Sequence, residues 1–187
     1  AFNELKNLKE LNLKNYIGLH FVKENTTKKT LDLSKKLSSE LVNDLVSLEK
    51  LCLVAIELEG CEKDSFKNLI SLKTLDLSSN KINKIDTSIF KDLQNLTFLD
   101  LRSNKNIKFD ESFLMENLEN LSTDWNDKMP NGLNRLKTLI IDNCEKMALK
   151  LELFKQENYL NKLNLSADYD SNNLKIGCDE FKKWKMP

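Results

Sequence analysis

A tandem leucine pattern is the feature that most constrains the fold of this chain. Residues 72–80 read L-K-T-L-D-L-S-S-N, and residues 96–104 read L-T-F-L-D-L-R-S-N. Both segments follow L-x-x-L-x-L-x-x-N, and their central leucines, Leu75 and Leu99, are 24 residues apart. Self-similarity at a spacing in this range indicates stacked structural repeats. The chain is therefore expected to fold as a solenoid.

The leucine that opens L-x-L marks each repeat, and eight such marks cover nearly the whole chain. They are Leu11, Leu31, Leu51, Leu75, Leu99, Leu121, Leu139 and Leu163, with steps of 20, 20, 24, 24, 22, 18 and 24 residues. Alternation within L-x-L predicts a short strand whose two leucines face the same side. The predicted inward pairs are Leu11/Leu13, Leu31/Leu33, Leu51/Leu53, Leu75/Leu77, Leu99/Leu101, Leu139/Ile141 and Leu163/Leu165, and Thr123 follows Leu121. Parallel stacking should bury these pairs in one shared core.

A polar position recurs five residues after the mark. It holds asparagine in three repeats, Asn80, Asn104 and Asn126, and cysteine in another, Cys144. An asparagine there can bond backbone groups of its own turn and of the neighbouring one. We therefore predict an internal Asn/Cys ladder. Lys36 and Ile56 occupy the same position in their turns, and local irregularity is expected at both.

An aromatic position recurs farther along each turn. Phe66, Phe90 and Phe154 come fifteen residues after their marks, and Phe113 comes fourteen after its mark. We interpret these residues as a core spine on the outer side of the coil rather than as a box for an aromatic ligand.

These repeats resemble leucine-rich repeats, and the 24-residue steps with phenylalanine resemble the extracellular type of that family. The resemblance implies an α/β repeat solenoid, a horseshoe with a concave parallel β-sheet and with loops and short helical turns on the convex face. Cysteine at the asparagine position is a recognised variant in the family. Residues 1–187 are expected to form a single solenoid of about eight repeats. We expect a fragment that lacks one or both caps, because no capping segment is visible at either end.

Composition argues against several function classes. Lys+Arg and Asp+Glu both count 29, so the chain lacks the basic excess that is typical of nucleic-acid binders. The longest apolar run has six residues, 51–56, whereas a membrane-spanning helix needs about 20. No membrane segment is therefore predicted in this chain.

Catalytic and cofactor signatures are also missing from the sequence. The four cysteines form no C-x-x-C pair and His20 is the sole histidine, so neither a metal site nor a cofactor is predicted. No glycine-rich phosphate loop or nucleophile motif occurs, and we expect no enzyme.

The repeat register also places the cysteines. Cys61, Cys144 and Cys178 should point inward as free thiols. Cys52 is expected to face outward from its strand and to be the only accessible thiol.

The outward side chains of the strands should form the binding surface. Phe98 is apolar at an outward position, with Asp100 and Arg102 beside it, Asp76 one turn away, and Trp125 at the edge. Aromatic and arginine side chains are frequent binding anchors, and we hypothesise that these five residues contribute to a partner site. The alternative is structural: Asp76 and Asp100 follow the repeated L-D-L-S form, and one exposed apolar residue needs no explanation.

Two functions remain open from the sequence. The resemblance to a segment of a Toll-like receptor or a related cell-surface ectodomain implies a signalling receptor of innate immunity. Such a module would bind a protein or another macromolecule on its concave or lateral face and often dimerises. The sequons at Asn25, Asn95, Asn120 and Asn164 are glycosylation candidates, although their number matches chance. Unpaired cysteines favour the alternative, a cytoplasmic scaffold or substrate adaptor.

Overall fold

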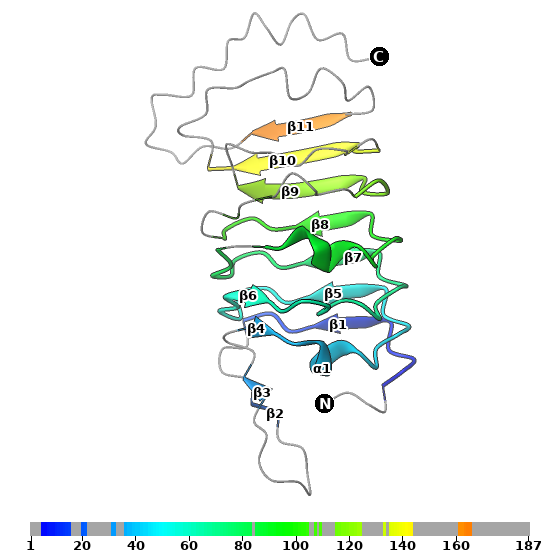
Figure 1. The fold of residues 1–187 in the computed structure, drawn as a ribbon. Coiled ribbons are helices and arrows are strands. Elements are labelled where there is room, and N and C mark those ends of the chain that lie inside the picture. Colours follow the sequence, from blue (N-terminus) through cyan, green and yellow to red (C-terminus); the bar gives the residue numbers. More distant parts are fainter. Residues whose placement is uncertain are drawn as a thin grey trace, which may run out of the picture.

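The computed structural model shows a stack of parallel strands that joins most of the predicted repeats (Figure 1). It describes residues 5–15, 20–21, 31–32, 36–83, 85–104, 107, 109, 115–124, 133, 135–143 and 161–165. Seven strands form the main sheet, in the order β1-β5-β7-β8-β9-β10-β11. They are β1 (Glu10–Asn12), β5 (Lys50–Cys52), β7 (Thr74–Asp76), β8 (Phe98–Asp100), β9 (Asn120–Asp124), β10 (Thr138–Asp142) and β11 (Lys162–Leu165). The predicted parallel solenoid is confirmed.

The register of the sheet aligns the marking leucines in one row. Leu51 pairs with Leu75, Leu75 with Leu99, and Leu99 with Leu121. The same alignment continues through Leu139 to Leu163. Each strand thus places its leucine pair directly over that of the next strand, and the shared core follows from this alignment.

The core lies on one side of the sheet and is almost fully dry. Leu51, Leu53, Leu75, Leu77, Leu99, Leu101, Leu121, Leu139, Ile141 and Thr123 are all at most 1% exposed. A second layer of leucines from the returning segments closes the core, including Leu45, Leu48, Leu69, Leu72, Leu93 and Leu96. Leu5 holds the register position of Leu45 but is 45% exposed, because no described rung covers β1 on that side.

The rung predicted at Leu31 is wrong. Leu31 lies in β3 (Leu31–Asp32), which pairs antiparallel with β2 (His20–Phe21) in a separate two-stranded sheet. Strand β1 pairs directly with β5, so Leu11 lies beside Leu51. Figure 1 shows β2 and β3 beyond the end of the stack. Leu33 lies outside the described residues, so only Leu31 of that predicted pair can be placed.

Short extended and helical pieces form the outer side of the coil. Strand β4 (Lys36–Leu37) pairs in parallel with β6 (Gly60–Cys61), and the α-helix α1 (Ser39–Val42) and the 3-10 helix η1 (Thr87–Phe90) each make a single turn. Phe66 and Phe90 stack with ring centroids 6.1 Å apart, as the spine predicts. Phe113 and Phe154 lie outside the described residues. No helix among the described residues is long and apolar enough to cross a membrane.

The irregularity expected at Lys36 and Ile56 takes two forms. Lys36 does not follow a rung of the main sheet, but instead lies in β4 opposite Gly60. Ile56 is a core residue that is only 1% exposed, and the residues on either side of it, Ala55 and Glu57, have positive φ angles of 54° and 65°.

A residue with a left-handed backbone conformation ends the strand segment of several rungs. Asn15, Ala55, Ser79, Ser103 and Asn143 each come four residues after their mark, with φ between 54° and 60°. Non-glycine residues rarely adopt this conformation, and asparagine tolerates it best. The chain turns here, so the next residue points back into the coil. In the rungs of β7 and β8, that residue is the ladder asparagine.

The asparagine ladder is confirmed at Asn80 and Asn104. Asn80 Oδ1 accepts the backbone N–H groups of Ile56 and Leu58, both at 3.1 Å, and its Nδ2 donates to the carbonyl of Leu53 at 2.6 Å. Asn104 repeats the arrangement one turn later, since it accepts the N–H of Ile82 at 3.1 Å. These bonds link adjacent turns through otherwise unpaired backbone groups. Asn126 and Cys144 lie outside the described residues.

Candidate interaction surface

We define the open face as the side of the main sheet opposite the leucine core. Three columns of side chains cross it in the described residues. They read Glu10, Lys50, Thr74, Phe98, Asn120, Thr138 and Lys162; then Asn12, Cys52, Asp76, Asp100, Ser122, Ile140 and Asn164; then Lys14, Val54, Ser78, Arg102, Asp124 and Asp142. The backbone register alone brings these residues together, although the columns span more than 150 positions of the sequence.

Asp76 and Asp100 each hold the backbone that follows their strand. The Oδ1 atom of Asp76 accepts the N–H of Ser78, and that of Asp100 accepts the N–H of Arg102, both at 3.0 Å. A short carboxylate two residues ahead of an N–H commonly makes such a turn. The structural interpretation of the L-D-L-S form therefore accounts for part of what these two residues do.

Asp100 also holds the guanidinium of Arg102. Arg102 Nη2 lies 2.7 Å from Oδ2 of Asp100, and Nε lies 3.1 Å from Oδ1, a two-pronged arrangement. The hydrogen bond to Asp100 is the largest reason why the pKa of Arg102 is raised. Arg102 Nη1 also lies 3.6 Å from a carboxylate oxygen of Asp142, two strands away.

Asp100 lies on the open face as expected, but its carboxylate is not accessible there. Its side chain is only 4% exposed, whereas that of Arg102 is 36% exposed. The arginine covers the aspartate, so a partner would meet the guanidinium of Arg102 before it reached the carboxylate of Asp100.

Asp124 connects the ends of neighbouring rungs. Its two carboxylate oxygens accept the backbone N–H groups of Ser103 and Asn104, at 3.1 Å and 3.0 Å. It also accepts a bond of 2.9 Å from Nδ2 of Asn143. The partner site predicted from the sequence did not include Asp124, although Asp124 lies three residues after Leu121, the position that Arg102 holds after Leu99.

Phe98 is half-buried on the open face. Register places it between Thr74 of β7 and Asn120 of β9. It precedes Asp100 by two residues on β8, so both side chains lie on the same face of the sheet. The sheet thus brings together four of the predicted partner residues: Phe98, Asp100, Arg102 and Asp76. Trp125, the fifth, lies outside the described residues.

Cys52 was predicted to be the only accessible thiol, and that prediction is wrong. It points to the open face as expected, but it is 8% exposed, because Asn12 and Asp76 flank it in the adjacent strands. Burial and then the charge of Asp76 raise the pKa of its thiol. Cys61 is half-buried as a residue, and burial of its thiol raises the pKa to about 12. Both cysteines are free, while Cys144 and Cys178 lie outside the described residues.

The glycosylation candidates lie in different surroundings. Asn95 is exposed on what we call the lateral side, the side of the stack that also carries Ser71 and Asn117, and its Nδ2 donates to the carbonyl of Ile70 at 2.8 Å. Asn120 is half-buried in β9 and begins a sequon whose Leu121 and Ser122 are 0% and 2% exposed. Asn164 is exposed in β11 on the open face, and Asn25 lies outside the described residues. A sugar on Asn95 would leave the open face clear, whereas one on Asn120 would obstruct it.

A polar row along the lateral side was not predicted. Ser71, Asn95 and Asn117 each donate to a carbonyl of the preceding turn, those of Val46, Ile70 and Gln94. The sequence signal was available, because each donor directly precedes the leucine three residues before a mark. Val46 and Ile70, which hold one register position in adjacent turns, are 42% and 60% exposed beside this row.

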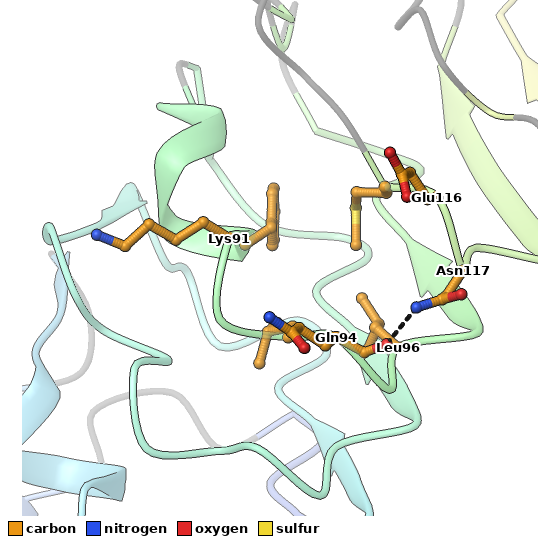
Figure 2. Close-up of a pocket in the computed structure, with 8 residues that line it drawn as sticks. Lys91, Gln94, Leu96, Glu116 and Asn117 are labelled. Carbon is orange, nitrogen blue, oxygen red and sulfur yellow. Dashed lines mark hydrogen bonds between the residues drawn. The ribbon is translucent and has the colours of Figure 1, made fainter.

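A cavity of about 350 Å³ lies where this row passes from one turn to the next (Figure 2). Its lining residues are Phe90, Lys91, Leu93, Gln94, Leu96, Met115, Glu116 and Asn117. The four apolar residues belong to the core, and each is at most 6% exposed. Asn117 bonds to the Gln94 carbonyl at 2.7 Å across the opening, so polar groups dominate what a ligand could touch.

A row of alternating charges follows the edge where each strand begins. Glu49 lies between Lys9 and Lys73, at 2.7 Å from each ammonium group. The hydrogen bond from Lys73, followed by that from Lys9, lowers the pKa of Glu49 to about 2. Lys137 and Glu119 form a further pair at 2.8 Å. These exposed pairs align neighbouring rungs, and each contributes little stability by itself.

Comparisons with known proteins agree with this architecture. Residues 46–105 match the family model described as leucine rich repeat. The same strand register continues on both sides of that segment, so the matched repeats are part of a longer leucine-rich-repeat solenoid. No curated protein matches the chain.

One solved structure supports the fold. The chain of a TLR13–ssRNA13 complex matches with a TM-score of 0.65 and 23% identity, over 89% of this chain. This chain therefore resembles a segment of a Toll-like receptor in fold, and it spans 22% of that chain's length. An internalin (inlF) from Listeria monocytogenes str. 4b F2365 matches with a TM-score of 0.38 and 16% identity, over 91% of this chain and 66% of that one.

Proposed function

We propose that this protein is a recognition module that binds a macromolecular partner on the open face of its sheet. One observation carries the proposal: the core occupies only one side of the sheet, and the described outward columns are polar apart from a few apolar side chains. Outward residues of such a sheet are not needed to fill the core, so they are available for contact with a partner. Phe98 and Arg102 are the anchors that we assign, and Asp76, Asp100 and Trp125 complete the proposed site, although Trp125 lies outside the described residues.

A second proposal concerns the larger protein. We infer a part of an extracellular or cell-surface receptor, and the fold likeness to TLR13 and the exposed sequon at Asn95 support this. The free thiols of Cys52 and Cys61 favour the alternative, an intracellular scaffold or substrate adaptor. Glycan occupancy at Asn95 in protein from its natural source separates the two, because an intracellular chain would carry no N-linked glycan. No catalytic role is proposed.

Binding on the open face can be tested without knowing the partner in advance. The chain serves as bait, captured proteins are identified by mass spectrometry, and their recovery is compared between two variants. Thr138→Trp adds bulk to the open face on β10, and Ile70→Trp adds the same bulk to the lateral side. We expect Thr138→Trp to abolish a specific capture that Ile70→Trp leaves intact.

The opposite pattern would contradict the proposal and would assign recognition to the lateral side. Phe98→Ala sharpens the result, because truncation of a central aromatic anchor commonly costs more than 1 kcal/mol, about a fivefold loss of affinity or more. Circular dichroism of all three variants confirms that the fold is retained.

A further inference from the structure

Strand β1 has one edge that no strand among the described residues covers. It pairs with β5 on one side and ends the main sheet on the other, while β2 and β3 pair with each other. Leu11 and Leu13 are only half-buried, whereas Leu51 and Leu53 of the next rung are fully buried. An uncovered edge of this kind, with apolar surface beneath it, is a place where a further strand can add.

Alternate residues of β1 present their backbone groups to the uncovered edge. The N–H groups of Leu13 and Asn15 donate to carbonyls of the β5 rung, at 2.8 Å and 2.9 Å. Neighbouring residues of a strand direct their N–H and C=O groups to opposite edges. The groups of Glu10, Asn12 and Lys14 therefore face away from β5, and an added strand must bond to these three residues.

The side chains of the same three residues lie together on the open face. Glu10, Asn12 and Lys14 begin its three columns, and all three are exposed. The side chain of Glu10 is 70% exposed, and its carboxylate lies as far as 4.0 Å from Nζ of Lys50. The edge thus carries one anion and one cation, with a neutral amide midway between them.

This order of charges makes the edge complementary to itself. If a second copy runs antiparallel to β1 about a two-fold axis at Asn12, Glu10 of each copy lies opposite Lys14 of the other. Leu11 of each copy then lies opposite Leu13 of the other on the core side. Directly opposed residues share a face, with Cα atoms about 5.5 Å apart where they are hydrogen-bonded. We propose that a second copy of this chain docks on the edge of β1 in this register and joins the two main sheets into one.

Head-to-tail stacking of β11 on β1 is the less favoured arrangement of two copies. It would continue the parallel register and would place Lys162 opposite Glu10. By the same register Lys14 would meet the uncharged Ser166, so only one of the two charges would gain a partner. Head-to-tail contacts of this kind also repeat without closing, whereas the two-fold arrangement closes as a dimer.

Sedimentation velocity of the full chain over a range of concentrations tests the proposal. We expect a dimer that dissociates on dilution and no larger species. Asn12→Pro should give a monomer, because proline removes the N–H group at the two-fold axis. That N–H faces the uncovered edge, where proline is tolerated, so the fold of the single chain should be retained. A parent chain that is monomeric throughout, or that forms species larger than a dimer, would overturn the proposal.

Charge reversal tests the register of the two strands. Glu10→Lys opposes cation to cation at both contacts and Lys14→Glu opposes carboxylate to carboxylate, so each variant alone should dimerise about tenfold more weakly or worse. An equimolar mixture of the two variants restores opposite charges at both contacts, and its heterodimer should form about as tightly as the parent dimer. Head-to-tail stacking predicts instead that Lys14→Glu associates as the parent does, which would refute the two-fold register.

Matched controls make the same charge changes elsewhere. Glu59→Lys and Lys67→Glu lie at exposed positions outside the main sheet, and each should dimerise as the parent does. Equal weakening in these controls, or a mixture of the β1 variants that stays monomeric, would overturn the proposal. Thr138→Trp lies on β10, toward the other end of the sheet, and should leave the dimer intact. Loss of the dimer and loss of open-face recognition are therefore separate outcomes.

Discussion

Two stretches of the chain carry the same L-x-L motif, yet only one of them forms a rung of the sheet. Leu75 lies in the main sheet, and Leu31 lies in a separate antiparallel pair. The difference is visible upstream of the motif. Leu72 and Leu69 stand three and six residues before Leu75 and are fully buried, whereas Lys28 and Asn25 hold the same positions before Leu31.

The comparison shows what a repeat consists of. A strand can bury its leucine pair only if the returning segment supplies the second apolar layer. Residues 36–50 supply that layer for β5, with Leu37, Leu41, Leu45 and Leu48 all at most 1% exposed. The regular repeat therefore resumes within the crossover, and the two apparent steps of 20 residues are one interval of 40 between Leu11 and Leu51.

Truncation of Leu75 and of Leu31 to alanine tests the difference between the two stretches most directly. Leu75→Ala should lower the free energy of unfolding by about 2–5 kcal/mol, because it leaves a cavity in a dry core. Leu31→Ala should cost clearly less, because β3 lies outside the main sheet. Urea denaturation followed by circular dichroism measures both. Equal losses would show that Leu31 is part of the shared core after all.

The sequence predicted most of the fold for a physical reason. The strand direction, the leucine core and the asparagine ladder each depend on residues within one turn or in the adjacent turn. The spacing of those residues is visible in the sequence. Spacing alone did not predict the direct pairing of β1 with β5, because the motif at Leu31 has the L-x-L spacing of a rung but lacks the leucines that precede it in a true repeat.

The candidate surface was predictable in position but not in accessibility. Register places Asp100 and Cys52 on the open face, and the structure confirms that placement. Exposure depends on how side chains lean across strands, and the spacing of leucines carries no information about that. The sequence therefore could not predict that Arg102 covers Asp100 or that the neighbours of Cys52 bury it.

Removal of a ladder asparagine probes the regular rungs. In Asn80→Ala, the backbone N–H groups of Ile56 and Leu58 lose their buried acceptor. We expect a loss of about 2–3 kcal/mol, since each buried unsatisfied group costs about 1–3 kcal/mol and some will find water. Urea denaturation provides the measurement. Asn68→Ala is the matched control, because its exposed amide makes one longer bond of 3.3 Å to Asn43, and a similar loss there would argue against a special role for the ladder.

Ser65 tests the contact between β4 and the following turn, where the regular repeat resumes. Ser65 is fully buried, and its hydroxyl lies 2.6 Å from the carbonyl of Leu37 in β4. Ser65→Ala should lower the free energy of unfolding by about 1 kcal/mol, the usual net value of one hydrogen bond. In Ser71→Ala, which removes a bond near solvent to Val46, the loss should be smaller. If the control variant unfolded more easily than Ser65→Ala, the packing of β4 on β6 would not be a stabilising joint.

The smallest expected effect on stability comes from the ion pairs of Glu49, which link the β1 rung to the β5 rung. Glu49 bonds both Lys9 of the β1 rung and Lys73 of the β7 rung, which requires β1 and β7 to flank β5 directly. Its pKa of about 2 in the folded chain lies below the ordinary value of 4.5, so its contribution to stability is present above about pH 5 and is lost as the pH falls toward 2.

The variant Glu49→Gln removes that titration. It should be slightly less stable than the parent at pH 7, and the two stability curves should converge as the pH falls to about 2. Urea midpoints measured from pH 7 to pH 2 give both curves, and 1 M salt should shrink the gap because the group is exposed to solvent. Parallel curves would mean that the two lysines do not hold Glu49 in solution. A rung inserted at Leu31 would have that consequence, because it would separate Lys9 from Glu49.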